Sequence, residues 1–170
     1  FVECQQVPQR RPVGQQQTHH LFAREVRGIQ HQLQHCDFLT ADIGLIPFNI
    51  DRKHWILGII DFNIRQLTVV DNYAGCTGTW NDRQEIGNAM YHFLTEWYRR
   101  RYKKPLPTGF RLHFDHDIPI QTNGLDCGMF VLKTAEFYSR GQPYIFCQDD
   151  MEFYRERTAW EVAHGELRYP

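Results

Sequence analysis

The alternation of hydrophobic and polar positions predicts three neighbouring strands in the first half of the chain. Residues 42–48, 54–62 and 66–71 are short runs rich in Ile, Leu, Val and Phe, a composition typical of strands. The run HWILGIIDF at 54–62 is almost wholly apolar, which predicts a central strand buried on both faces. Residues 63–65 predict a turn, so the second and third runs are expected to pair as a hairpin.

Helical periodicity follows in the second half of the chain. Residues 80–102 carry one apolar stripe at i, i+4, i+7, i+8 and i+11, formed by Ile86, Met90, Phe93, Leu94 and Trp97. Residues 127–138 and 149–167 predict two more helices, and residues 110–114 predict a short strand. This order predicts an α+β domain with a small mixed or antiparallel central sheet flanked by helices.

The front of the chain differs from the rest. Residues 1–20 are rich in Gln and have no clear period, and residues 21–34 predict a short helix. We therefore divide the chain into an N-terminal Gln-rich segment, residues 1–41, and a folded domain, residues 42–170. The segment is interpreted as the truncated or divergent front of that domain. Because no initiator Met opens the sequence, we expect it to be a piece of a longer protein.

Composition narrows the class of protein. The 170 residues are 42% hydrophobic with a net charge of −1, which favours a globular domain over a nucleic-acid binder. No apolar stretch approaches the roughly 18 residues that a membrane span needs, and no secretory signal opens the chain. The five cysteines are scattered without a CxxC pair, which favours reduced thiols. We expect an intracellular monomer, in the nucleus and/or cytoplasm, without nucleic-acid or membrane partners.

The segment QTNGLDCGMF at 121–130 places a cysteine directly after a turn signal and at the start of an apolar helix. Helix amide dipoles at that end favour the thiolate of Cys127, although most free cysteines are only small buried side chains. A reactive thiol needs a base, and the base needs an orienting acid. His54 begins the most apolar strand and Asp71 ends the next, so the hairpin would bring them together. Gln121 would complete an oxyanion hole with the backbone N–H of Cys127.

The three motifs that carry these residues resemble one known family. His-Trp at 54–55, VVDNYAG at 69–75 and QTNGLDCGMFV at 121–131 are similar to the ubiquitin-like-protein-specific cysteine proteases, the SUMO/sentrin protease family. The likeness begins near residue 42 and includes the ending MEFYRERTAWEVAHGEL. It implies a papain-like cysteine protease fold with the chain order His…Asp…Cys. In that fold His54 is the base, Asp71 the orienter, Cys127 the nucleophile and Gln121 an oxyanion donor.

The resemblance also implies a substrate. Trp55 would wall a narrow tunnel for the Gly-Gly tail of a ubiquitin-like modifier, where only residues without a Cβ fit. The expected activity is that of a thiol protease or isopeptidase cleaving after Gly-Gly, with SUMO as the expected modifier and no cofactor or metal. One family feature is not found. Residues 1–20 contain no Trp, whereas family members open with a Trp-Leu-Asn-Asp-like segment that supplies the other tunnel wall.

Three alternatives stay open at this point. In the first alternative, the modifier is NEDD8 or ubiquitin rather than SUMO. In the second, the domain binds a modifier without cleaving it. A metal- or nucleic-acid-binding domain is the third, because of His31, His35 and Cys36 at helical spacing, the pair His113 and His116, and the basic run at 99–104. No four-ligand set has zinc-site spacing, and a basic run at a helix end is usually solvated surface.

Overall fold

The computed structural model describes residues 41–50, 52–73 and 79–168, which belong to one compact unit spanning residues 37–170. The predicted helix at 21–34 and all but the last residue of the predicted N-terminal segment lie outside the described residues. The elements are β1 (Ile43–Ile50), β2 (His54–Asp61), β3 (Gln66–Val70), α2 (Thr79–Tyr102), β4 (Arg111–Phe114), α3 (Cys127–Ser139), a 3-10 turn η1 (Gln148–Asp150) and α4 (Met151–His164).

The strands form one mixed sheet in the order β1-β2-β3-β4. β1 pairs with β2 and β2 pairs with β3 in antiparallel fashion, whereas β3 and β4 are parallel. The expected hairpin and the expected α+β class are therefore both confirmed. Pro47 is accommodated because β1 is an edge strand of this sheet, where a missing ladder donor costs little.

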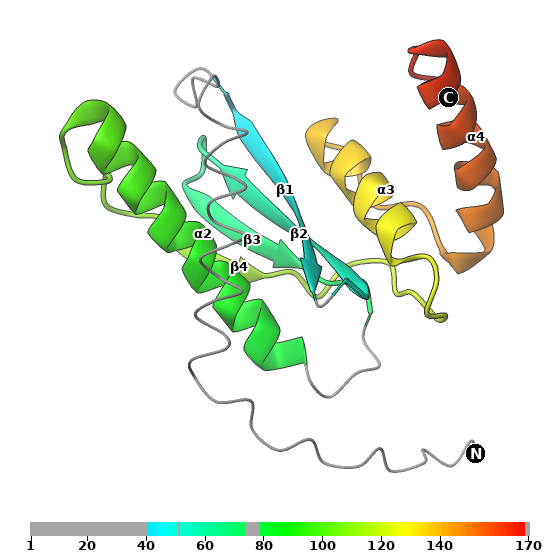
Figure 1. Ribbon diagram of the computed structural model, residues 1–170, viewed down its shortest axis with the longest axis horizontal. Helices are drawn as coiled ribbons and strands as arrows, with labels where there is room; N and C mark the ends of the chain where they lie inside the picture. The colour runs from blue at the N-terminus through cyan, green and yellow to red at the C-terminus, as the bar shows by residue number, and fades with distance from the viewer. Residues whose placement is uncertain (1–40, 51, 74–78, 169–170) are drawn as a thin grey trace, which may run out of the picture. The chain divides into compact units, whose positions relative to one another are not determined.

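Helices α2 and α3 cover opposite faces of the sheet (Figure 1). On one face, Met90 of α2 packs so closely over Gly58 that a Cβ there would lie 2.7 Å from its sulfur. On the other, Val131 of α3 packs against Leu57 and Ile59. The middle of β2 is fully buried between these layers, as the apolar run at 54–62 predicts. Because side chains alternate along β2, His54 and Trp55 at its start point to different faces.

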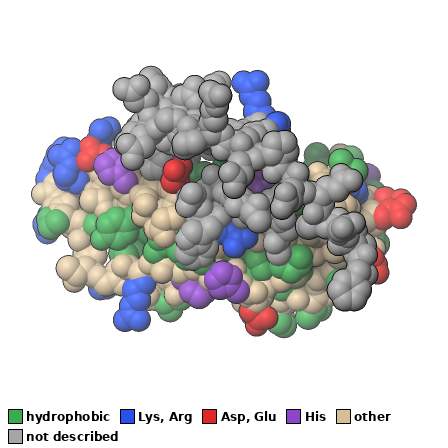
Figure 2. All heavy atoms as spheres, turned by 90° about the horizontal axis from the view of Figure 1, so that it is seen from below, with side chains coloured by type: hydrophobic (Ala, Val, Ile, Leu, Met, Phe, Trp, Pro, Cys, Tyr) green, Lys and Arg blue, Asp and Glu red, His purple; other side chains and the backbone are tan. Residues whose placement is uncertain are grey.

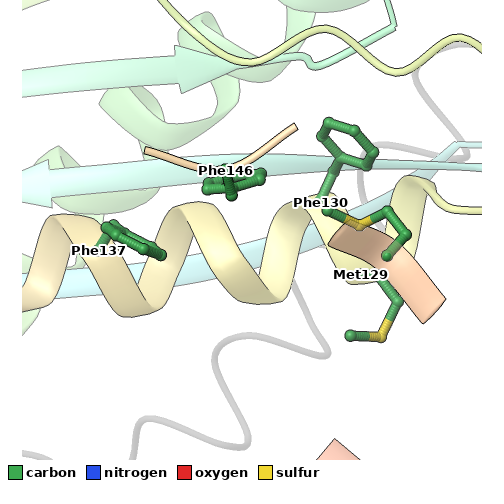
Figure 3. Packing of buried hydrophobic residues seen from close by; sticks show 5 residues of the cluster. Met129, Phe130, Phe137 and Phe146 are labelled. Carbon is green, nitrogen blue, oxygen red and sulfur yellow. The ribbon is translucent and has the colours of Figure 1, made fainter. Parts of the chain in front are cut away.

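An aromatic cluster fastens α4 to the outer side of α3 (Figure 3). Phe146, on the segment between the two helices, lies 5.7 Å from Phe130 and 5.4 Å from Phe137, measured between ring centroids. Met129 and Met151 complete the buried cluster. The position of α4 is therefore fixed by packing on α3 rather than by contact with the sheet.

The last helix is shorter than its periodicity predicts. The expected helix at 149–167 begins with the 3-10 turn and ends at His164. The prediction was wrong at this end because Gly165 adopts the left-handed conformation (φ 66°) and its N–H bonds to the carbonyl of Glu161. A left-handed glycine is a common helix stop.

Charges of both signs are interspersed with hydrophobic side chains on the face of the molecule drawn in Figure 2. In the basic run at 99–104, Arg99 and Arg100 pair with Glu96 on the same helix, at 2.7 and 2.5 Å. Both arginines share this one carboxylate, so the helix end keeps a net positive charge. None of the helices described here is long and apolar enough to cross a membrane.

Candidate active site

A histidine and an aspartate meet at the end of the β2–β3 hairpin. Nε2 of His54 lies 2.8 Å from Oδ1 of Asp71, seventeen residues away in the sequence. The register explains the contact, because Leu57 pairs with Val70, so the start of β2 faces the residues just after β3. The predicted proximity of the two side chains is confirmed. The His54 side chain is 19% exposed, whereas that of Asp71 is fully buried.

Asp71 is held as an anion by donors from three segments. Besides His54, the backbone N–H of Tyr73 donates to Oδ1 at 3.0 Å, and Nε of Arg83 donates to Oδ2 at 3.0 Å. Burial would raise the pKa of Asp71. The hydrogen bonds from His54 and Tyr73 and the charges of His54 and Arg83 outweigh it and hold that pKa below its usual value.

Asn72 connects the hairpin to the loop that precedes α3. Its carbonyl accepts the backbone N–H of Gln121 at 2.7 Å, and its side-chain Nδ2 donates to the carbonyl of Pro119 at 2.9 Å. Asn72 and Gln121 are both buried. The residue next to Asp71 therefore fixes where the loop carrying Gln121 begins. This role has no local signature, because Asn after a strand usually forms a turn.

Gln121 is placed in this loop but is engaged with its own neighbour. Its Nε2 donates to the carbonyl of Asn123 and lies 3.5 Å from Oδ1 of the same residue. A side-chain amide carries two N–H donors, and both acceptors of this amide belong to Asn123, so an oxyanion would have to replace the long 3.5 Å contact. Oε1 of Gln121 is buried and, among the described residues, has no hydrogen-bond partner.

Cys127 is the first residue of α3, as the turn signal before it predicts. Cys127 is 8% exposed, and its thiol is not part of a disulfide. Trp55, itself 37% exposed, lies beside the same helix start, since a Cβ built on Gly128 would be 3.7 Å from Cδ1 of the indole. The residues adjoining this contact are His54 and Cys127. The start of β2 and the start of α3 therefore meet at one end of the sheet.

The carboxylate of Asp126, the residue before Cys127, organises the loop. It does not cap α3; instead it accepts hydrogen bonds from Nδ2 of Asn123 (2.6 Å), Nε2 of Gln148 (2.7 Å) and Nε of Arg155 (2.9 Å). Burial would raise the pKa of Asp126, but these hydrogen bonds and the Arg155 charge hold it below its usual value. A second guanidinium N–H of Arg155 donates to the carbonyl of Leu125 at 3.1 Å.

Arg155→Met is expected to loosen the loop that presents Cys127. In the variant, the nearly buried Asp126 carboxylate keeps only amide donors and has no compensating positive charge. This negative charge also opposes a thiolate at Cys127, the next residue. We expect the free energy of unfolding to fall by about 1 to 2 kcal/mol, the lower part of the range for hydrogen bonds to charged groups, because solvent screens the half-exposed Arg155 side chain.

Thermal melts and the rate of Cys127 alkylation by iodoacetamide measure the two effects of Arg155→Met. Glu156→Gln, an exposed change on the neighbouring position of α4, is the matched control. An Arg155→Met protein with unchanged stability and alkylation rate would contradict this assignment.

A second buried acceptor lies near Trp55. Asn49 of β1 pairs directly with Trp55 in the β1–β2 register, so the two side chains share one face of the sheet. Its Oδ1, like Oε1 of Gln121, is buried without a hydrogen-bond partner among the described residues. Buried polar atoms are nearly always paired, so each of these two oxygens is expected to have a partner that the described residues do not supply. Sequence reasoning missed Asn49, although a polar residue in an otherwise apolar strand is a usable signal.

A buried His–Asp pair beside a helix that starts with a free cysteine, on an α+β scaffold, defines the class of cysteine-type peptidases. The chain belongs to the Ulp1 protease family: the family model of its C-terminal catalytic domain matches residues 3–167. That match begins well before residue 42, where the likeness read from the sequence starts.

Individual relatives agree with the family match. The Arabidopsis thaliana protein named putative ubiquitin-like-specific protease 1B is 35% identical over 127 residues, covering 74% of this chain and 36% of that protein. Human sentrin-specific protease 2 is 31% identical over 139 residues, covering 77% of this chain and 22% of that protein. This chain thus spans about a third or less of the length of these two relatives.

A solved structure shares the fold. The C-terminal Ulp1 protease domain in complex with Smt3, the yeast ortholog of SUMO, superimposes with a TM-score of 0.67 at 24% sequence identity. The match covers 85% of this chain and 63% of the solved one. The expected α+β cysteine protease fold is therefore confirmed.

The metal-site alternative gains no support from the described part of the chain. No group of three or more His, Cys, Asp or Glu side chains gathers there in a way that would hold a metal ion. This includes His113 and His116, whereas His31, His35 and Cys36 lie outside the described residues.

Proposed function

We propose that this domain is a thiol protease or isopeptidase that cleaves after the C-terminal Gly-Gly of a ubiquitin-like modifier, with SUMO as the expected modifier. The observation that carries the proposal is the buried hydrogen bond between His54 and Asp71 at the end of the sheet where α3 starts with Cys127. Support for the substrate class comes from relatives named as ubiquitin-like-specific and sentrin-specific proteases, and from the Ulp1 domain solved with Smt3.

In the proposed reaction Cys127 is the nucleophile and His54 the acid–base group. Cys127 first transfers its thiol proton to His54, and the thiolate then attacks the carbonyl carbon of the terminal glycine, so that the C=O electron pair moves to oxygen. The backbone N–H of Cys127 and the second N–H of Gln121 stabilise this oxyanion, each donor contributing roughly 3 kcal/mol. Collapse expels the lysine amine, which takes a proton from His54. His54 then deprotonates a water that hydrolyses the thioester and frees the modifier and the thiol.

The substrate tail would run over the exposed indole of Trp55 toward Cys127. A flat aromatic wall of this kind leaves room for glycine and excludes side chains with a Cβ. Oδ1 of Asn49, which has no hydrogen-bond partner in the described part of the chain, lies on the same face as Trp55 and is suited to accept a backbone N–H of an extended peptide. The same site would serve both removal of a modifier from conjugates and processing of a modifier precursor. We infer that the domain acts as a monomer inside the cell, in the nucleus and/or cytoplasm.

Modifiers carrying an electrophile after the terminal Gly-Gly test this function. SUMO, NEDD8 and ubiquitin probes are incubated in parallel with the protein, and adducts are detected by intact-mass measurement. We expect an adduct with the SUMO probe. An adduct with only the NEDD8 or the ubiquitin probe would correct the modifier. A folded protein that binds a modifier but forms no adduct with any probe would replace the proposal with that of a binding module.

A further inference from the structure

Arg83 is not one of the proposed catalytic residues, but it contacts Asp71, which is. Its Nε lies 3.0 Å from Oδ2 of Asp71, the carboxylate oxygen that His54 does not use. The Asp71 side chain is fully buried, and that of Arg83 is 15% exposed. Arg83 lies near the start of α2, which packs on the face of the sheet opposite α3 (Figure 1). The contact therefore links Asp71 to a helix other than the one that carries Cys127.

We infer that Arg83 is a positioning residue of this site, which keeps the Asp71 carboxylate ionised and oriented toward His54 throughout turnover. The inference rests on the proposed function, in which His54 alternates between a charged and a neutral form. Whenever His54 is neutral, Asp71 would be a fully buried anion without a cation partner, which is costly. The guanidinium of Arg83 remains charged at every working pH and supplies that partner.

The same contact fixes the direction of the carboxylate. Three donors reach Asp71 from three segments: His54 from β2, the Tyr73 N–H from the turn after β3, and Arg83 from α2. Rotation of the carboxylate about its Cβ–Cγ bond would break the bond to Arg83 as well as that to His54. Among the described residues, His54 and Arg83 are the charged or titratable groups that lower the pKa of Asp71.

Arg83→Met, which keeps an unbranched apolar stem but removes the guanidinium and its charge, tests the inference. The readout is the rate of Cys127 alkylation by iodoacetamide between pH 5 and pH 8, which requires no modifier. We expect roughly a tenfold loss, within the range of coupling inside one hydrogen-bond network. The loss should be larger at pH 5, because Asp71 without Arg83 takes up a proton at higher pH. Arg83→Lys should recover most of the rate, and Arg101→Met, an exposed change on the same helix, should change nothing.

A double-mutant cycle decides whether Arg83 acts through Asp71. In an Asp71→Asn background, Arg83→Met should change the alkylation rate less than twofold. An equal loss in both backgrounds, or a loss independent of pH and not recovered by Lys, would overturn the inference. If Arg83→Met melts before the assay temperature, Arg83→Gln replaces it in the same cycle. The alkylation assay does not use the modifier probes, so the two proposals can fail separately. Coupling between Arg83 and Asp71 in the alkylation rates, together with no adduct from any modifier probe, would refute the proposed function and leave the role of Arg83 standing.

Discussion

Cys127→Ala is expected to abolish both adduct formation with the reactive modifier probe and cleavage of Gly-Gly-linked substrates. Without the sulfur there is no atom to form the acyl intermediate, and a water attacking unaided must replace it. Losses on the order of 10⁵-fold or more accompany removal of a nucleophile that acts as a unit with its base. The substitution is small and its site is a helix start, so the fold should persist.

The measurement for Cys127→Ala is single-turnover cleavage of a modifier–lysine conjugate, followed by gel densitometry. Cys147→Ala is the matched control, because Cys147 is the other free thiol among the described residues and is exposed on the segment before α4. It should leave the cleavage rate and the adduct unchanged. An adduct that survives in Cys127→Ala but disappears in Cys147→Ala would show that Cys147, and not Cys127, is the nucleophile.

The second large effect is expected for Asp71→Asn. The amide is nearly the same size, but it places no negative charge beside His54 and Arg83. An imidazolium formed during the reaction then lacks its counter-ion, and the amide no longer holds the histidine in one tautomer. A loss on the order of 10⁴-fold in kcat follows this change in a Ser-His-Asp protease, and we expect a large loss here for the same physical reason. Steady-state cleavage of a fluorogenic Gly-Gly conjugate measures it, and a variant with more than a tenth of the normal kcat would contradict the proposed role.

The stability of Asp71→Asn should depend on pH in a defined direction. The folded-state pKa of Asp71 lies below its unfolded value, so its ionised form stabilises the fold above the unfolded pKa of about 3.9. That contribution is lost as the pH falls through the folded-state pKa. Urea titrations of both proteins should therefore show their largest difference above about pH 5 and a shrinking one toward pH 3. A constant difference over this range would show that the ionisation of Asp71 does not contribute.

The backbone arrangement was largely predictable because it depends on local patterns. A short turn between two apolar runs fixes the hairpin register, and the register alone brings His54 to Asp71. A turn signal followed by an apolar run likewise predicts that α3 starts at Cys127. Gly165 was read as part of the last helix because periodicity does not reveal a left-handed glycine. The Gln-rich segment and the short helix predicted within residues 1–40 stay predictions from the sequence.

The supporting contacts of the site were not predictable in the same way. Arg155 binds Asp126 across 29 residues, and the packing that brings α4 to this loop is encoded by an aromatic cluster elsewhere. Arg83 did leave a trace. It precedes Ile86 and Met90 by three and seven residues, so it continues the apolar stripe of α2 with a charge. A charged residue on the buried face of a helix indicates a buried partner, but the partner appears only once the helix is docked.

The attachment of the Cys127 loop to α4 has a consequence for the order in which the protein is made. Ribosomes synthesise a chain from its N-terminus, so the hairpin with His54 and Asp71 emerges first and α3 with Cys127 follows. Gln148 and Arg155, which hold Asp126, emerge later still. A nascent chain thus carries its thiol before it carries the side chains that hold the thiol's loop in place. We therefore expect the proposed proteolytic activity to appear only after α4 has docked.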